Sequence, residues 1–504
     1  MVERKNSIVA IGAIVLFCAL VYWIVSIRTK HAVDYGRLPG YITSIMKDWQ
    51  VPGLAIAIVH NNTIEFMSGF GVLKHGENVP VDKDTIFAIG SCSKAFTATA
   101  LGLLVDEGKI TWQDKVHTFF PDLKLPDECM TKMLTVCDML SHRTGLEEAS
   151  FLWDKTFLSR KELIHRMRYL KSEKDFRTGW VYNNIMYMAA GEIIPVVTGT
   201  SWDDFVAQRF FGPLGMKRSN TSVMALEGVS NVAEPHILID GQIHVIPHKN
   251  IDNVGPAGSI NSTITDIAQW VKMLVNNGNF EGEQIIKPET LHYTHEPHTF
   301  MSHEYPYHLY GLGWGMLELH GHKVLFHEGN IDGMSAFIGL LPSKNVGLAV
   351  LTNIHKGFMG KVLVNYIFES FLGVKSGIDW NQKYLKEDVE KRDKMKQEVQ
   401  ERLAKRNADI KQSYSIEQFV GHYYSDLYGD LDVSLVDGNQ LHVKFLAYDG
   451  ILQHWESDVF FLDQLPLYPT VGDKFFFEFT GNKKRIMQVR VRVKDEVDGI
   501  FKKA

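Results

Sequence analysis

Ser91 stands three residues before Lys94, and the two open an almost uncharged segment of small and apolar residues. This composition predicts a buried helix over residues 91–105, with the hydroxyl and the amine on one face, one turn apart. Burial and the helix dipole both disfavour an ammonium ion at this position. A lysine in such a setting can be neutral and can accept the proton of the serine hydroxyl. Because Ser-x-x-Lys also fits any exposed helical turn, its meaning depends on what accompanies it.

A tyrosine and two amides precede a second apolar run. Tyr182-Asn-Asn184 follows Gly-Trp-Val and leads into residues 185–191, which are apolar and end in glycine. The pattern predicts a loop that enters a helix, with Asn183 or Asn184 as the N-cap residue. The tyrosine and the amide would then lie together at the start of that helix.

A third polar motif lies between two strand-like runs. His327-Glu-Gly329 follows the apolar residues 323–326 and is followed by a turn over residues 330–333 and a second apolar run over residues 334–341. Runs of this length bounded by glycine, asparagine and aspartate are typical of strands. We therefore expect a hairpin with the polar motif at its edge.

These three motifs, in this order and at these distances, resemble those of the beta-lactamase-related serine hydrolases. That family includes class C beta-lactamases, penicillin-binding D,D-peptidases and certain esterases and aminopeptidases. Its pattern is Ser-x-x-Lys, Tyr-x-Asn and Lys-Thr-Gly, the last often His-x-Gly in the esterase-like and peptidase-like branches. The resemblance covers about two thirds of the chain and continues in residues 51–59, 140–146, 213–216, 256–263, 310–314 and 347–353.

The resemblance implies a role for each residue of the first two motifs. Ser91 would be the nucleophile and would form an acyl-enzyme, while Lys94 and Tyr182 would share the proton transfers. Which of the two is the general base stays open, because both pKa values depend on neighbours that the sequence does not show. Asn184 would donate a hydrogen bond to the carbonyl side of the substrate. Cys92, beside the nucleophile, points about 100° away on a helix and is expected to pack as a small apolar residue.

The third motif is expected to bind substrate through His327, Gly329 and Asn330. By resemblance, the backbone N–H groups of Ser91 and Asn330 form the oxyanion hole, where each donor is worth on the order of a few kcal/mol. His327 replaces a lysine that would attract a substrate carboxylate, and an imidazole is mostly neutral at pH 7. Ester, amide or short-peptide substrates are therefore favoured over penicillins. A true beta-lactamase or D,D-peptidase remains an alternative, as does a binding or matrix protein with little turnover.

The resemblance implies an α+β fold, a beta-lactamase/transpeptidase-like domain over residues 36–380 with an antiparallel sheet, flanking helices and a helical subdomain. Residues 381–412 are densely charged and predict a solvated linker helix. Short alternating runs over residues 413–504 predict a small all-β barrel, which resembles the lipocalin-like domain that follows the hydrolase domain in several relatives. Its His454-Trp455 pair would either reach toward the active site or pack the barrel.

The N-terminus predicts a membrane helix. After a short tail of residues 1–7, residues 8–27 carry no charge and are long enough to span a bilayer as a signal anchor. The alternative is a cleaved signal peptide and a secreted protein, although no small-x-small cleavage pattern occurs. The flanking charges are balanced and do not set the orientation of this run. The resemblance to the family, whose large domains usually work outside the cytosol, implies an extracytoplasmic catalytic domain. There Asn61 and Asn220 would be potential glycosylation acceptors, and Asn261, which is expected near the active site, is the least favoured acceptor.

Composition excludes several other classes. A net charge of −6 argues against a nucleic-acid surface. No cofactor and no metal site are expected, because His295 and His298 lack the spacing of a helical zinc motif and predict a solvated loop. With four cysteines in 504 residues the chain is not a disulfide scaffold.

Overall fold

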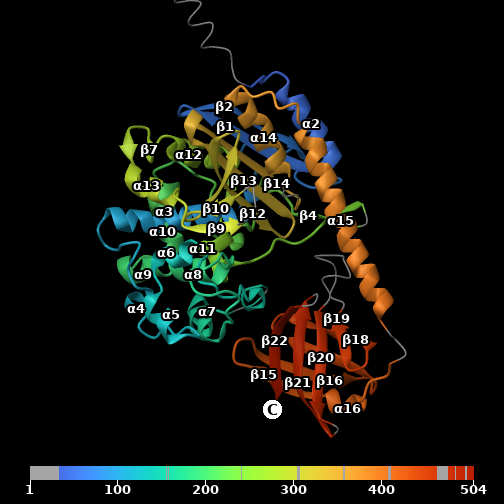
Figure 1. Ribbon diagram of the computed structural model, residues 1–504. Coiled ribbons are helices and arrows are strands. Elements are labelled where there is room, and N and C mark those ends of the chain that lie inside the picture. Colours follow the sequence, from blue (N-terminus) through green and yellow to red (C-terminus); the bar gives the residue numbers. More distant parts are fainter. Residues whose placement is uncertain are drawn as a thin grey trace, which may run out of the picture.

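The computed structural model describes residues 33–504 with the exceptions of 155, 157, 240, 303–306, 356–357, 407–409, 463–474, 483 and 494–495. Over these residues the chain forms an antiparallel sheet with helices on its faces, a helical region, a long linking helix and a closed barrel (Figure 1). The predicted α+β fold with a C-terminal barrel is confirmed. None of the helices in this part of the chain is both long and apolar enough to cross a membrane. The anchor predicted over residues 8–27 lies outside the described residues and stays a prediction.

Eight strands form the main sheet, and neighbouring strands pair antiparallel. In spatial order they are β2 (Thr63–Gly71), β1 (Gly53–His60), β14 (Val346–Thr352), β13 (Met334–Leu341), β12 (His322–Ile331), β11 (Gly315–Leu319), β10 (His308–Tyr310) and β9 (Thr299–Ser302). The expected hairpin is therefore present as β12 and β13. Its polar motif lies within β12, an interior strand, and not at an edge.

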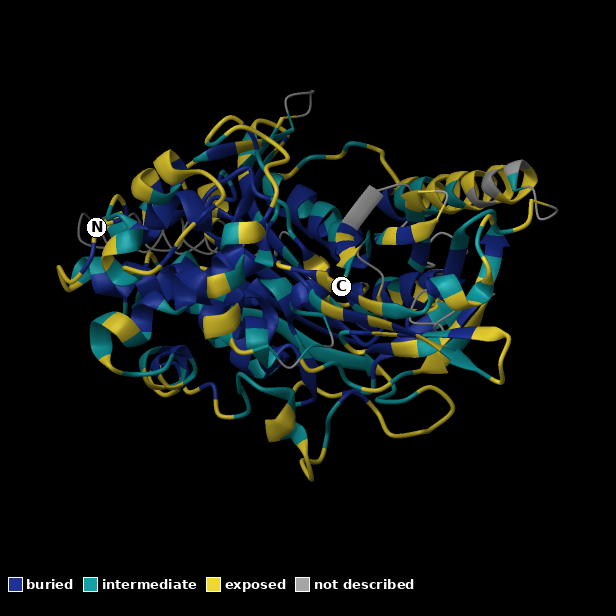
Figure 2. Ribbon diagram, turned by 90° about the horizontal axis from the view of Figure 1, so that it is seen from below, coloured by how far each residue is buried: buried dark blue, intermediate teal, exposed yellow. Residues whose placement is uncertain are grey.

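The two faces of the sheet bury different residues, as the period of two in a strand requires. On β1, Leu54, Ile56 and Ile58 pack into a core shared with α2 (Leu38–Trp49) and α14 (Phe358–Leu372). The alternate residues of β1 are mostly alanine and join the larger core, which also holds residues of α3 (Ser93–Asp106) and α12 (Ile264–Val275). Figure 2 shows this interior in dark blue. Small residues on that face of β1 leave room for α12, which packs against it.

A helical region packs beside the sheet and surrounds α3, which is buried on nearly all sides. Its helices are α4 (Val116–Phe119), α5 (Glu128–Met133), α6 (Val136–Leu140), α7 (Arg160–Arg166), α8 (Asn184–Gly191), α9 (Ile193–Thr198), α10 (Trp202–Val206), α11 (Gly255–Gly258) and α13 (Pro288–Thr294). Three two-stranded antiparallel sheets complete it: β3 (Ile86–Ala88) with β6 (Asn261–Thr263), β4 (His236–Ile239) with β5 (Gln242–Val245), and β7 (Asn279–Phe280) with β8 (Glu283–Gln284).

A helix of 26 residues, α15 (Trp380–Lys405), runs beside the sheet domain and leads to the barrel (Figure 1). Most of its described residues are exposed. After α16 (Ile416–Phe419), eight antiparallel strands close on themselves: β15 (Gly421–Ser425), β16 (Gly429–Val436), β17 (Gln440–Phe445), β18 (Tyr448–Glu456), β19 (Val459–Leu462), β20 (Phe475–Asn482), β21 (Arg485–Val493) and β22 (Glu496–Lys503). Pairing of Tyr423 with Lys503 closes the barrel.

Six of the eight barrel strands are predicted by the alternating runs at residues 419–424, 431–435, 440–445, 459–462, 474–479 and 487–493. The two strands without such a prediction are β18 and β22. Both contain an Asp-Gly pair, which in isolation favours a turn. Closure of the barrel pairs β18 and β22 on both sides, and these contacts outweigh the local signal. Trp455 in β18 is buried against Phe461 and Phe476, so the His454-Trp455 pair packs the barrel.

Candidate active site

Ser91 lies in a 3₁₀ turn, Gly90–Cys92, that connects β3 to the start of α3. It therefore precedes the helix that the sequence predicts it to open. Gly90 has φ of +50°, a conformation that glycine adopts at little cost. Two hydrogen bonds join the residues on either side of the turn to Ile260, the residue before β6: Ile89 N donates to Ile260 O at 3.0 Å, and Ile260 N donates to Ser93 Oγ at 3.2 Å. The nucleophile candidate is thus held on a rigid connection, with its own side chain partly exposed.

Lys94, on the first turn of α3, is fully buried and points at the serine. Its Nζ lies 3.1 Å from Ser91 Oγ, 2.7 Å from Asn184 Oδ1 and 2.8 Å from the carbonyl oxygen of Ala257. The last two atoms can only accept hydrogen bonds, so they take both N–H groups of a neutral amine. The lone pair of that amine is then left for the Ser91 hydroxyl. This arrangement lets Lys94 accept the serine proton without moving.

Tyr182 contacts the same oxygen from the other side, with its hydroxyl donating to Ser91 Oγ at 2.7 Å. The tyrosine comes from the loop before α8, where the Asn183 side chain accepts from Met186 N and caps the helix. Asn183 N in turn donates to Nδ1 of the buried His142, whose ring packs 4.4 Å from that of Tyr182. A helix cap and a buried imidazole therefore hold the phenol in place.

Burial sets the protonation of these groups. It lowers the pKa of Lys94 to about 7, and the nearby Glu148 carboxylate acts against this shift. Burial raises the pKa of Tyr182 well above its usual value, with Tyr310 acting in the same direction. Removing a charged group from water disfavours its ionised form, which explains both directions. Near neutral pH the site therefore holds a phenol that donates and a lysine that can change its charge.

His327 lies in β12 with both ring nitrogens occupied. Nε2 is 2.9 Å from Tyr310 Oη, and Nδ1 is 2.7 Å from the carbonyl oxygen of Glu328. Because a carbonyl only accepts, Nδ1 carries the proton and Nε2 accepts from the Tyr310 hydroxyl. Burial, with Lys94 nearby, lowers the pKa of His327 to about 3. The imidazole is therefore neutral and supplies no positive charge.

Gly329 and Asn330 bring β12 against the turn that holds Ser91. A Cβ on Gly90 would lie 2.8 Å from Asn330 N, so this backbone amide is beside the nucleophile's own turn. Asn330 pairs with Ser335 in the hairpin, and its Oδ1 accepts from Ser335 Oγ at 2.8 Å. The two N–H groups expected in the oxyanion hole thus come from adjacent backbone segments.

All seven predicted site residues belong to three motifs that are far apart in the sequence, and the fold brings these motifs together. Cys92, which the sequence suggests as a packed residue, is buried, and its Sγ contacts the His327 carbonyl oxygen at 3.3 Å. Burial raises the pKa of its thiol. His295 is buried, so the solvated loop predicted there is wrong at that residue. Asn261 is also buried, with Nδ2 donating to Asn220 Oδ1 at 2.9 Å, which leaves no room for a glycan on it.

Comparison with known proteins identifies the family. Residues 38–367, well over half of the chain, match the family model described as Beta-lactamase. The chain belongs to the beta-lactamase family. Among its relatives, Unguisins hydrolase ungD' of Aspergillus campestris is 29% identical to this chain over 370 residues, which cover 68% of this chain and 66% of that protein. Penicillin-binding protein 4 of Amycolatopsis lactamdurans is 24% identical over 369 residues, 68% of this chain and 91% of that protein.

A solved structure shares the fold of this beta-lactamase family member. The octameric penicillin-binding protein homologue from Pyrococcus abyssi superposes with a TM-score of 0.63 at 23% identity, covering 93% of this chain and 100% of that one. Its coverage includes the barrel as well as the sheet domain. The alignment with the first curated relative, in contrast, spans just under two thirds of that protein, 66%.

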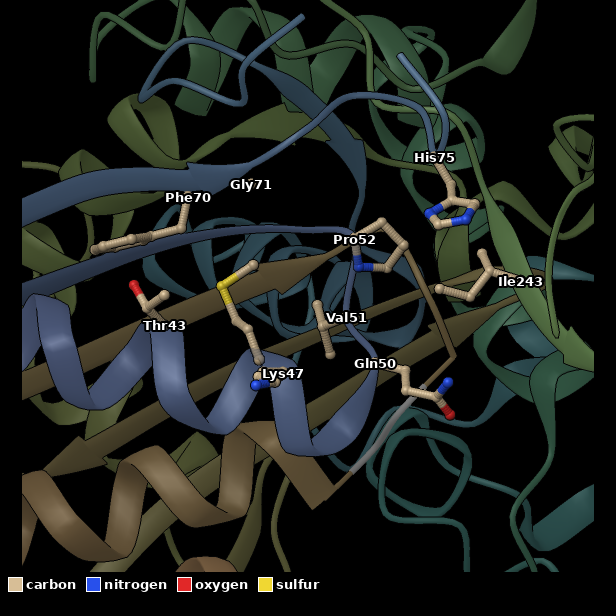
Figure 3. Close-up of a pocket in the computed structure, with 10 residues that line it drawn as sticks. Thr43, Lys47, Gln50, Val51, Pro52, Phe70, Gly71, His75 and Ile243 are labelled. Carbon is tan, nitrogen blue, oxygen red and sulfur yellow. The ribbon is translucent and has the colours of Figure 1, made fainter. Parts of the chain in front are cut away.

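Two polar residues of the site carry no role in the three motifs. Glu148 follows the Leu140–Leu146 segment and accepts from Asn184 Nδ2 at 2.6 Å, and Tyr310 donates to His327. Glu148 comes two residues after that segment, and the sequence does not distinguish it from Glu147. Figure 3 shows a separate surface pocket of about 360 Å³, lined by residues of α2, β2 and β5 with Pro52 and His75. Its lining includes none of the predicted site residues.

Proposed function

We propose that this protein is a serine hydrolase that cleaves esters, amides or short peptides through an acyl-enzyme on Ser91. The observation that carries this proposal is that Ser91 Oγ lies within hydrogen-bond distance of both Lys94 Nζ, at 3.1 Å, and the Tyr182 hydroxyl, at 2.7 Å. A nucleophile that contacts a group able to take its proton, beside a second group able to donate one, has the parts that acyl transfer needs. Relatives named as a hydrolase and a penicillin-binding protein support the same reaction class.

In the proposed acylation step, Lys94 Nζ takes the proton from Ser91 Oγ as the oxygen attacks the substrate carbonyl carbon. The carbonyl oxygen becomes an oxyanion, which the backbone N–H groups of Ser91 and Asn330 stabilise. When the bond to the leaving group breaks, the Tyr182 hydroxyl donates a proton to that group and recovers one from Lys94. A water molecule then attacks the acyl-enzyme, and the same groups return the proton to Ser91.

The charges around the site favour substrates without a carboxylate next to the scissile bond. His327 is neutral, because its pKa lies well below 7. Lys249, a partly buried lysine near the turn after β12, already pairs with Asp154 at 2.7 Å and Asp332 at 3.2 Å. Its charge is therefore compensated inside the protein. An ester, an amide or a blocked peptide avoids the cost of placing an unpaired carboxylate here.

Labelling of the full chain with a fluorophosphonate tests the proposal. We expect intact-protein mass spectrometry to show one adduct on the wild type, located at Ser91 by peptide mapping, and hydrolysis of a chromogenic ester. Ser91→Ala should keep the fold, since it removes only a partly exposed hydroxyl, and should lose both adduct and turnover. Normal labelling of that variant, or an unlabelled and inactive wild type, would contradict the proposal.

A further inference from the structure

The segment of residues 148–154 touches the active site at one end and the barrel at the other. At the first end, Glu148 Oε1 accepts the 2.6 Å hydrogen bond from Asn184 Nδ2. Three residues later, Phe151 lies in a short 3₁₀ helix of the hydrolase domain, Ser150–Leu152, and is only 6% exposed. Barrel rings surround its ring, with centroids 5.2 to 6.1 Å away, at Tyr428, Phe445, Tyr448 and Phe475. The barrel therefore supplies the apolar pocket for this side chain.

A polar contact fixes the far end of the segment. Asp154 Oδ2 accepts from the hydroxyl of Tyr448 at 3.2 Å, while its Oδ1 pairs with Lys249. Lys249 also pairs with Asp332, two residues after Asn330. Tyr448 thus connects the barrel both to the segment and, through Lys249, to the turn that follows β12. A second polar contact joins the two domains, because Arg166 Nη1, at the end of α7, donates to the carbonyl oxygen of Leu427 in the barrel at 2.7 Å.

Glu148 determines which way the Asn184 amide faces. A carboxylate only accepts hydrogen bonds, so it selects the NH₂ side of the amide and leaves Oδ1 for Lys94. The opposite orientation would place an NH₂ group against Lys94 Nζ, and the lysine would lose one of the two acceptors that direct its lone pair to Ser91. The contact between Glu148 and Asn184 therefore acts on Lys94 without touching it.

We propose that residues 148–154, here called the strap, connect the barrel to the active site. Contacts of the strap with the barrel hold Glu148 in place, and Glu148 in turn positions Asn184 and, through it, Lys94. Glu148 is the positioning residue of this strap, and Phe151 and Asp154 are its anchors on the barrel. The proposal rests on the proposed hydrolase function and adds to it that the barrel takes part in the acylation step. It places a determinant of catalysis in a domain that carries none of the three family motifs.

The anchor can be tested in the full chain with Phe151→Ala, and Phe460→Ala is a matched control. Phe460 lies in the barrel core against Phe419, with ring centroids 4.9 Å apart, and has no contact with Phe151 among the described ring pairs. Both variants lose a buried ring. We expect Phe151→Ala to slow acylation of Ser91 at least tenfold in kcat, with KM changing less, and Phe460→Ala to leave kcat within about twofold at a temperature where both are folded.

Two more conservative variants, each losing only a hydroxyl, test the same contact with less risk that the protein unfolds. Tyr448→Phe keeps the ring that contacts Phe151 and removes the hydroxyl that donates to Asp154. Its control, Tyr423→Phe, removes a buried barrel hydroxyl that donates to the Phe419 carbonyl oxygen. Circular dichroism in the near ultraviolet should show both variants folded. Only Tyr448→Phe should lower kcat, by about threefold or more.

A double-mutant cycle tests whether the strap acts through Glu148. Glu148→Gln keeps an acceptor oxygen and should retain more activity than Glu148→Ala. In the Glu148→Ala background, Phe151→Ala should cost much less than the tenfold expected alone, because the link to Asn184 is already absent. If the fold losses of kcat in the two single variants multiply in the double variant, or if both single variants have normal kcat, the strap proposal is wrong. Labelling of Ser91 would be unaffected by either result, so the hydrolase proposal would stand. An unlabelled wild type would instead overturn the hydrolase proposal and the strap with it.

Discussion

The Cα of Gly329 faces the carbonyl oxygen of Ile89 so closely that a Cβ there would lie 1.8 Å from that oxygen. No side chain fits such a gap, because real contacts to a methyl group need roughly 3.5 Å or more. Gly329 is therefore the residue that lets β12 approach the turn before Ser91. The same approach brings Asn330 N beside Gly90, where the oxyanion hole is proposed.

Gly329→Ala should force β12 away from the Ser91 turn. Displacing an oxyanion-hole donor costs about 10² to 10³ in kcat, and overpacking costs about 1 to 3 kcal/mol of stability. Gly40→Ala is the control, because a Cβ on Gly40 meets nothing within 4 Å. It should keep full activity and raise the melting temperature slightly, since alanine favours a helix interior. Turnover and thermal unfolding of the two variants check this, and normal turnover in Gly329→Ala would contradict it.

The activity should rise with pH through about 7. Lys94 must be neutral to accept the Ser91 proton, and burial lowers its pKa from 10.5 to about 7 against the opposing effect of Glu148. The acid limb of log kcat/KM should therefore bend near pH 7. A bend near pH 10 would mean that the lysine is charged in the free enzyme.

The same shift predicts a stability effect of defined sign. Between pH 7 and 10.5 the unfolded chain holds a proton on Lys94 that the folded chain has lost. The free energy of unfolding should therefore increase with pH across this window. In Lys94→Met this contribution is absent, so its stability should rise less steeply with pH than that of the wild type. Urea denaturation at pH 7, 8 and 9 measures both slopes, and parallel slopes would contradict the shifted pKa.

Removing either proton-transfer group should slow the reaction, but not equally. Lys94→Met removes the proposed base, and Tyr182→Phe keeps the ring while removing the donor to Ser91 Oγ. A positioned proton-transfer group contributes about 10² to 10⁴ in rate, and we expect the larger loss in acylation for Lys94→Met. Tyr187→Phe is a matched control, because its hydroxyl donates to the Leu140 carbonyl oxygen. Stopped-flow acylation rates would assign the base to Tyr182 if its variant is the slower one.

The sequence predicts the motifs of this site because each is local. Ser91 and Lys94 are three residues apart, and the Asn183 cap and the apolar run after it are contiguous. The extent of β12 cannot be predicted in the same way. Gly329 and Asn330 favour a turn locally, but they pair with Ala336 and Ser335 in the hairpin because the approach to the Ser91 turn requires it.

The role of Glu148 also cannot be predicted from the sequence. It lies 36 residues from Asn184, and nothing in the sequence around it distinguishes it from its neighbour Glu147. Only the fold brings its carboxylate to the amide and directs Glu147 to Lys171 N instead. The anchor of Phe151 in the barrel is of the same kind. A phenylalanine in the sequence predicts that its side chain is buried, but it does not predict which domain buries it.

The last prediction concerns substrate charge and His327. Because this imidazole is neutral and both its nitrogens are occupied, uncharged esters should be hydrolysed better than matched substrates that carry a carboxylate near the scissile bond. His327→Lys would place a cation about where Nε2 now accepts from Tyr310. One ion pair in a partly dry site is worth about 1 to 3 kcal/mol, so the ratio of kcat/KM for the two substrates should shift about tenfold to a hundredfold toward the carboxylate. Tyr310→Phe removes the same hydrogen bond without adding charge and should leave that ratio near the wild-type value. An unchanged ratio in active His327→Lys enzyme would mean that selectivity is set by residues other than His327.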